Sequence, residues 1–154
     1  MNAIGLNDQP SKELAAKLNT LLANYHVFYI NVRGYHWNIK GEKFFELHAK
    51  FEELYNDVVL KIDEIAERIK TQGETPLHTY TDYLQQSAIT ERKNISAGKE
   101  AVQDILDALK QLLLLEREIL KKSADNGDEG TNALMSDYIR QQEKMVWMYN
   151  AYLS

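Results

Sequence analysis

Five side chains that can bind a metal ion lie in the first half of the sequence. They are His36, His48, Glu52, Asp63 and Glu67. His48 and Glu52 are four residues apart, and the two acidic residues that follow have the same spacing. Residues four apart share a helix face, so the two side chains of each pair could bind the same ion. Because the sequence contains no cysteine, a metal site must use imidazole and carboxylate ligands, which suit iron but also accept zinc or manganese.

Amphipathic helices are the elements that must position these residues. Apolar residues recur at three-four spacing, which predicts long helices over about 11–38, about 44–72, about 94–122 and about 131–152. Residues 74–93 are less periodic but contain an apolar cluster that fits a short helix inside a long crossover. Gly73 and Pro76 mark the end of the second helix. The sequence thus predicts a short tail over residues 1–10 and a single domain over 11–153.

Four long helices with one long middle connection are the pattern of a ferritin-like four-helix bundle. The fold class is therefore all-α, with a short extra helix between helices 2 and 3. Hydrophobic content of 44% and charged content of 27% are ordinary for a globular domain. No apolar run reaches the roughly 18 residues of a membrane span, and residues 1–10 lack the features of a signal peptide. We expect a cytoplasmic protein.

The metal-binding candidates of the second predicted helix form one stripe beside its apolar face. With His48 at 0° on a helical wheel, Glu52 falls at about 40°. Asp63 and Glu67 fall at about 60° and about 100°, whereas the apolar residues fall at roughly 240–320°. The candidates therefore share one side of the helix, although many solvated helices also carry carboxylates beside their core.

Distance divides the candidates into two groups. His48 and Asp63 are about 22 Å apart along the helix axis, and metal–ligand bonds of roughly 2 Å cannot join them. His36 lies near His48 and far from Asp63. If all the candidates serve one kind of site, a second chain must run antiparallel and supply the distant carboxylates. A two-fold axis near residues 57–58 would then create two equivalent sites between subunits.

A metal centre inside a single bundle is the alternative. Ferritin-like di-iron centres of that kind use Glu-x-x-His pairs on two helices. The residues three positions before the four histidines are Ala23, Arg33, Phe45 and Thr75. Because none of them is a glutamate, a single-chain di-iron centre is not expected.

These motifs resemble the signature of the Dps family, the ferritin-like DNA-binding proteins from starved cells. The resemblance rests on His36-Trp37-Asn38, on Gly41, Phe44, His48 and Glu52, and on the run from Asp63 to Arg68. It extends over about residues 12–152, including the short crossover helix and the Trp147-containing last helix. It implies a dodecamer, built from two-fold dimers, that oxidises Fe(II), preferably with hydrogen peroxide, and stores the ferric product.

The resemblance also implies roles for individual residues. It makes His36, His48 and Glu52 of one subunit, with Asp63 and Glu67 of its mate, the ligands of a site for one or two iron ions. Trp37 would intercept stray radicals. Acidic residues near the last interhelical turn of related shells line three-fold pores, which makes Asp125, Asp128 and Glu129 candidates for iron entry. Asp128 or Glu129 could instead simply cap the last helix.

Two features depart from the family pattern. DNA-compacting members carry a basic tail, but this sequence has no basic residue before Lys12 and a net charge of −5. We therefore expect weak or absent DNA binding, and a DNA-condensing structural protein with a secondary metal site is the alternative function. Ala49 stands where many relatives have an acidic residue linked to mineral nucleation, so Glu46 or Glu53 would have to replace it.

Overall fold

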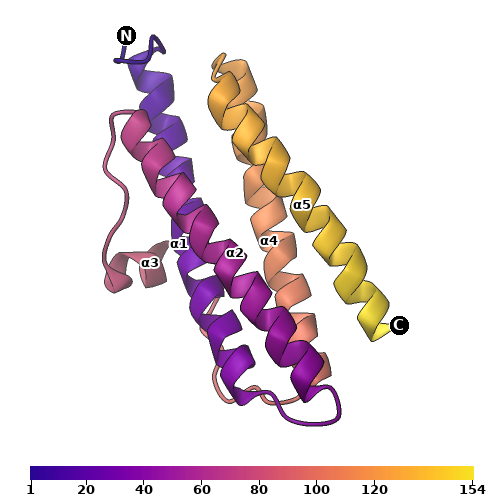
Figure 1. Cartoon of the computed structure of the whole chain (residues 1–154). Coiled ribbons are helices and arrows are strands. Elements are labelled where there is room, and N and C mark those ends of the chain that lie inside the picture. The colour runs from indigo at the N-terminus through magenta and orange to yellow at the C-terminus, as the bar shows by residue number, and fades with distance from the viewer.

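The computed structural model describes residues 1–154 and consists of five helices. They are α1 (Asp8–Asn38), α2 (Phe44–Thr71), α3 (Tyr80–Gln86), α4 (Gly98–Asp125) and α5 (Glu129–Leu153). Figure 1 shows α1 and α2 side by side, α4 and α5 behind and beside them, and the crossover with α3 running along the outside. The all-α, ferritin-like bundle with a short crossover helix is confirmed. None of the helices is both long and apolar enough to span a membrane.

The helix boundaries depart from the sequence-based ones by a few residues. The first helix begins at Asp8 rather than near residue 11. Pro10 fits inside this first turn because the amide that it lacks has no partner within a helix at that position. At the other end of the crossover, α4 begins at Gly98 rather than near residue 94. Asn94 instead has a positive φ of 61°, and Lys40 N donates to Ser96 O at 2.9 Å just before the helix begins.

Gly98 marks a close approach between helices. A Cβ atom at this position would lie 2.7 Å from Leu47 Cδ1 and 3.3 Å from the Tyr152 hydroxyl. From the sequence alone, this glycine is only a residue of low helix propensity inside the third long helix. The structure makes it the first residue of α4, where the start of α2 and the end of α5 converge on it.

The core is formed by the apolar stripes of all four long helices. Its largest fully buried side chains include Leu14, Phe28, Phe51, Ile105 and Leu112. α1 packs against both α2 and α4, and α5 packs against α4. The end of α1 and the start of α2 are joined by only five residues, which places the histidine-bearing ends of these helices side by side.

Candidate metal centre

His36 and His48 are brought together by the tight connection between α1 and α2. His36 Nδ1 lies 2.6 Å from the backbone oxygen of His48, and His48 Nδ1 lies 2.8 Å from the backbone oxygen of His36. The two rings stack with centroids 3.8 Å apart and an interplanar angle of 13°. Phe44 stacks on the outer side of His48 at 4.9 Å. Two reciprocal hydrogen bonds and a stack of rings thus fix both imidazoles.

This arrangement assigns the proton on each ring. A carbonyl oxygen can only accept a hydrogen bond, so both Nδ1 atoms must carry hydrogen. In the neutral ring the Nε2 lone pair is then free, which is the form in which histidine binds a metal. His36 is only 6% exposed. The structure therefore presents two oriented imidazole rings whose Nε2 atoms take part in no hydrogen bond within the chain, an arrangement that fits an iron, zinc or manganese ion.

Glu52 lies one turn after His48 on α2, as the spacing predicts, and its side chain is exposed. Its Oε1 accepts a hydrogen bond from the Tyr55 hydroxyl at 3.4 Å. The Tyr55 ring also contacts His36 edge-on, with centroids 5.3 Å apart. Tyr55 thus touches members of the candidate site from both α1 and α2, a role that the sequence pattern does not reveal.

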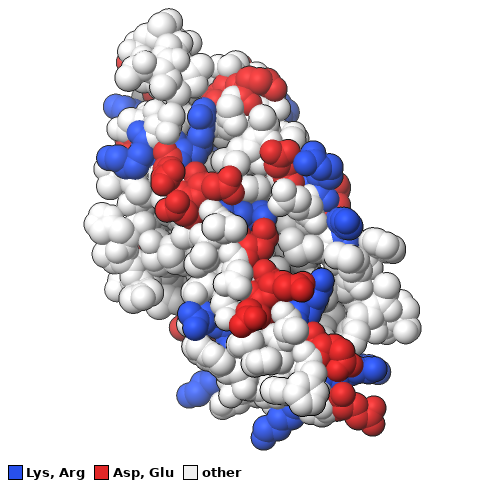
Figure 2. Space-filling view, viewed as in Figure 1, with Lys and Arg blue, Asp and Glu red and all other residues white.

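Asp63 and Glu67 lie on the second half of α2 and are not part of this cluster. Both are exposed, and neither carboxylate takes part in a hydrogen bond or an ion pair within the chain. No three His, Asp or Glu side chains of the single chain lie close enough to hold a metal ion. Figure 2 shows a diagonal band of acidic side chains across the face on which α2 lies. One chain therefore carries two separate groups of candidate ligands.

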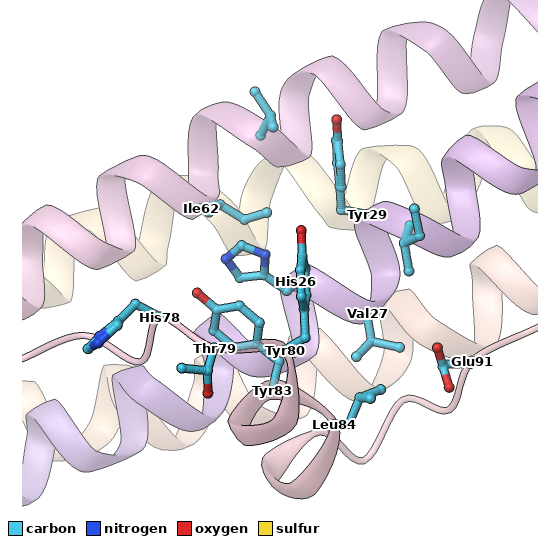
Figure 3. Close-up of a pocket in the computed structure, with 12 residues that line it drawn as sticks. His26, Val27, Tyr29, Ile62, His78, Thr79, Tyr80, Tyr83, Leu84 and Glu91 are labelled. Carbon is cyan, nitrogen blue, oxygen red and sulfur yellow. The ribbon is translucent and has the colours of Figure 1, made fainter.

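An apolar surface separates the two groups of candidate ligands. Val59 and Leu60 of α2 are 42% and 64% exposed. Beside them, a hollow of about 700 Å³ opens between α1, α2 and α3. Figure 3 shows it lined by side chains of all three helices, including Tyr29, Ile62 and Leu84. An exposed apolar area of this kind is typical of a surface that another protein covers.

His26 and His78 border this hollow and do not join the metal-binding candidates. The His26 ring stacks on Tyr83 of α3 with centroids 3.9 Å apart. Burial lowers the pKa of His26, which favours the neutral ring. His78 Nδ1 contacts the backbone oxygen of Pro76 at 3.0 Å and the side chain is exposed. His26 therefore packs α1 against α3, whereas His78 has only a local contact within the crossover.

Trp37 lies at the surface beside the candidate site. Its ring is 58% exposed and lies 4.7 Å from the guanidinium of Arg33. The guanidinium also lies over the rings of Tyr29 and Tyr55, at 5.7 and 5.1 Å. Residues 29, 33 and 37 are four apart and share one face of α1, so the sequence could have indicated that they cluster. The sequence could not have indicated Tyr55, because it belongs to α2.

The three acidic residues near the last turn have different environments. Asp125 is exposed and pairs with Lys121 at 2.9 Å, and Glu129 is exposed in the first turn of α5. Asp128 is 2% exposed and caps α5 by accepting from the Thr131 amide at 3.0 Å. Its carboxylate also pairs with Arg68 at 2.7 Å. The capping alternative thus holds for Asp128, whose oxygens are occupied within the chain.

A buried polar cluster in the bundle interior has no signal in the sequence pattern. The Tyr25 hydroxyl donates to the carboxylate of Glu116 and contacts the amide of Gln142. Glu116 is fully buried. Burial raises the pKa of its carboxyl group to about 7. The hydrogen bonds from Tyr25 and Gln142 lower this pKa, but their effect is smaller than that of burial. The interior of the single bundle therefore holds one titratable carboxyl group rather than a set of metal ligands.

Comparisons with known proteins identify the family. The family described as "Ferritin-like domain" matches residues 15–154. A DNA protection during starvation protein of Porphyromonas gingivalis is 37% identical, covering 99% of this chain and 96% of that protein. The crystal structure of the DPS protein from Vibrio cholerae O1, described as one of the ferritin-like diiron-carboxylate proteins, has a TM-score of 0.99 and 55% identity, covering 100% of this chain and 97% of that one. A Dps protein from Bacillus brevis has a TM-score of 0.91 and 31% identity, covering 94% and 97%. With its bundle, its short crossover helix and its paired histidines, the chain belongs to the Dps family.

Proposed function

We propose that this protein is an iron-oxidising mini-ferritin whose ferroxidase site forms between two copies of the chain. The observation that carries the proposal is the oriented pair His36 and His48, which presents two free Nε2 atoms without enough carboxylates of its own chain to complete a site. Membership of the Dps family and similarity to a ferritin-like diiron-carboxylate protein support iron as the metal.

The missing ligands would come from the second half of a partner's α2. A two-fold axis near residues 57–58 would place the partner subunit's Asp63 beside Glu52, and the partner subunit's Glu67 beside His48. Val59 and Leu60 lie next to that axis, and their exposure supports an apolar centre for the interface. Two equivalent sites would form at the two ends of this contact.

The ligand set suits the oxidation of Fe(II). Carboxylates stabilise the higher charge of Fe(III), while the neutral imidazoles hold the ion in place. Two Fe(II) ions give up one electron each, and with two protons these electrons reduce one hydrogen peroxide to two waters. Oxygen is the alternative oxidant. Paired electron transfer avoids release of hydroxyl radical, and Trp37 would intercept radicals that escape.

Storage of the ferric product requires a closed shell, for which we propose a dodecamer built from the two-fold dimers. Asp125 and Glu129 are the exposed acidic residues near the last turn and are the candidates for guiding Fe(II) through a pore. Because Ala49 has no carboxylate, nucleation of the mineral would fall to Glu46 or Glu53, which are exposed but pair with Lys43 and Lys50.

DNA condensation is the competing function, and the surface charge does not favour it. Binding to DNA requires clustered lysines and arginines that displace counterions from phosphates. Figure 2 shows basic side chains interspersed with acidic ones and no basic stripe on this face. Twelve copies of a chain with a net charge of −5 would carry about −60 and repel a phosphate backbone.

Subunit mixing tests the shared site directly. His48→Ala and Asp63→Asn should each abolish rapid oxidation of Fe(II) by peroxide, because each damages every site of a homo-oligomer. When the two variants are dissociated and reassembled together, mixed dimers contain one intact and one doubly damaged site. About a quarter of the wild-type rate should return. The mixture of each variant with itself is the control, and a mixture that stays inactive despite forming mixed dimers would contradict a site shared between chains.

A further inference from the structure

Arg33 carries a positive charge that no carboxylate of its own chain neutralises. The other four arginines, at positions 68, 92, 117 and 140, each form an ion pair. The only hydrogen bond of the Arg33 side chain is from Nη1 to the Tyr29 hydroxyl, at 2.9 Å. Nε is closed off from solvent and has no acceptor. A partly desolvated guanidinium with unused donors is unfavourable unless an anion reaches it.

Aromatic rings hold this cation in a fixed place. The guanidinium lies over Tyr29, Trp37 and Tyr55 at 5.7, 4.7 and 5.1 Å, within the range of cation–π attraction. Arg33 is linked to the candidate metal ligands through the Tyr55 ring, which contacts both His36 and Glu52. Its position is set before any partner binds, so a partner's anion would meet a preorganised donor.

Arg33 also lies at the edge of the exposed apolar surface on α1 and α2. Ile30, one turn before it on α1, is 48% exposed, and Leu60 of α2 is 64% exposed. Tyr29, the hydrogen-bond partner of Arg33, borders the hollow, where Figure 3 shows it reaching from α1 toward α2. An unpaired cation at the rim of an apolar surface points to an acidic group on the molecule that covers this surface.

We propose that Arg33 pairs with the partner subunit's Asp63 across the two-fold interface and acts as a positioning residue for the shared metal site. This inference rests on the proposed function, because the same axis near residues 57–58 places the partner subunit's Asp63 opposite Glu52. Glu52 lies about 4.5 Å along the axis of α2 from Tyr55. The Arg33 guanidinium lies over the Tyr55 ring and is therefore near the expected position of the partner's carboxylate. The partner subunit's Glu67 would lie about 10 Å from the level of Tyr55 and is the less accessible acid.

The pairing gives the partner's carboxylate a defined orientation before a metal ion arrives. The Nη2 atom of Arg33 has no hydrogen bond and can donate to one carboxylate oxygen, leaving the other oxygen for the metal. A fixed ligand loses less freedom on binding, so the metal is held more tightly. Arg33 would therefore couple formation of the dimer to completion of the metal site.

A double-mutant cycle on the full-length, metal-free protein tests the pairing. The four proteins are wild type, Arg33→Gln, Asp63→Asn and the double variant, with two-fold association measured by sedimentation at several salt concentrations. Each single substitution should weaken association about tenfold. The double variant should be no weaker than the weaker single variant, because the same contact is lost only once. Arg33→Lys should recover part of the association, and Arg140→Gln, which breaks an exposed pair with Asp137, should leave it unchanged.

Additive losses of association free energy in the cycle would overturn the pairing. Unchanged association of Arg33→Gln would also overturn it, and a bound inorganic anion would then be the group that neutralises Arg33. Calorimetric titration with Zn(II) separates this failure from failure of the proposed function. If Asp63→Asn weakens Zn(II) binding while the cycle is additive, the shared site stands and the Arg33 contact is wrong. If Asp63→Asn binds Zn(II) as wild type does, the shared site itself is wrong.

Discussion

His36 and His48 hold one another through reciprocal contacts from each Nδ1 atom to the other residue's backbone oxygen, at 2.6 and 2.8 Å. Each residue is therefore both a candidate ligand and the group that orients its neighbour. In metal sites of known proteins, hydrogen bonds that orient a ligating histidine have a large effect on affinity. Because the orienting groups are backbone oxygens, replacing one histidine side chain removes a ligand but keeps the oxygen that orients the other ring.

Replacing His48 with alanine should weaken Zn(II) binding by roughly 10–100-fold or more, because a ligand is lost and His36 loses its stacking partner. Isothermal titration calorimetry measures the change. His78→Ala is the matched control, since His78 is exposed and its ring contacts only Pro76 O. Equal affinities for the two variants would show that the histidine pair does not bind the metal.

Glu116 should make the stability of the protein fall as the pH rises from about 4.5 to about 7. Burial raises the pKa of its carboxyl group from 4.5 to about 7 in the folded state. Between these values the folded chain keeps a proton that the unfolded chain releases, so raising the pH favours unfolding by up to about 3 kcal/mol. Glu116→Gln removes this dependence. Urea unfolding at pH 5 and pH 7.5 should show that the stability of the variant relative to wild type increases with pH, and a constant difference would contradict the prediction.

Asp128 and Asp125 should differ strongly in their effect on stability. Asp128→Ala removes a helix cap and leaves Arg68 and Gln72 without their partner, which should cost about 3 kcal/mol. Asp125→Ala breaks only an exposed pair with Lys121 and should change the free energy of unfolding by about 0.5 kcal/mol or less. Thermal unfolding at neutral pH compares them. Similar melting temperatures would refute the structural role of Asp128.

Alanine should have opposite effects at two helical glycines. At Gly98, the new Cβ would meet Leu47 Cδ1 at 2.7 Å, so Gly98→Ala should destabilise the fold by about 1–3 kcal/mol. At Gly34, inside α1, no atom lies within 4 Å of the new Cβ, so Gly34→Ala should stabilise it by about 0.5–1 kcal/mol. Chemical unfolding measures the change in the free energy of unfolding for each variant. Changes of the same sign in both variants would refute the prediction.

Binding to duplex DNA should be weak at physiological salt. The net charge of −5 leaves no excess of basic side chains to displace counterions from phosphates. A gel-shift series from low to physiological salt measures retention. As a positive control, a variant with several lysines added at the N-terminus should retain DNA. Tight, salt-sensitive retention by the unmodified protein would favour the DNA-condensing alternative.

Local patterns in the sequence were enough to predict the class of fold and the family. The three-four spacing of apolar residues reports one buried face per helix, so four helices and a crossover follow from local pattern alone. The division of the metal candidates into two groups also follows from sequence, because helix rise fixes the distance between His48 and Asp63 at about 22 Å.

The packing of the bundle was needed to establish which side chains of different helices are in contact. Sequence spacing cannot relate Arg33 to Tyr55, or Asp128 to Arg68, because these contacts depend on how two helices pack. The same holds for the reciprocal histidine contacts, which need the end of α1 and the start of α2 at one level. Among the acidic residues of the last turn, burial separated Asp128 from Asp125 and Glu129. The composition of the turn could not separate these three residues, because all three are acidic.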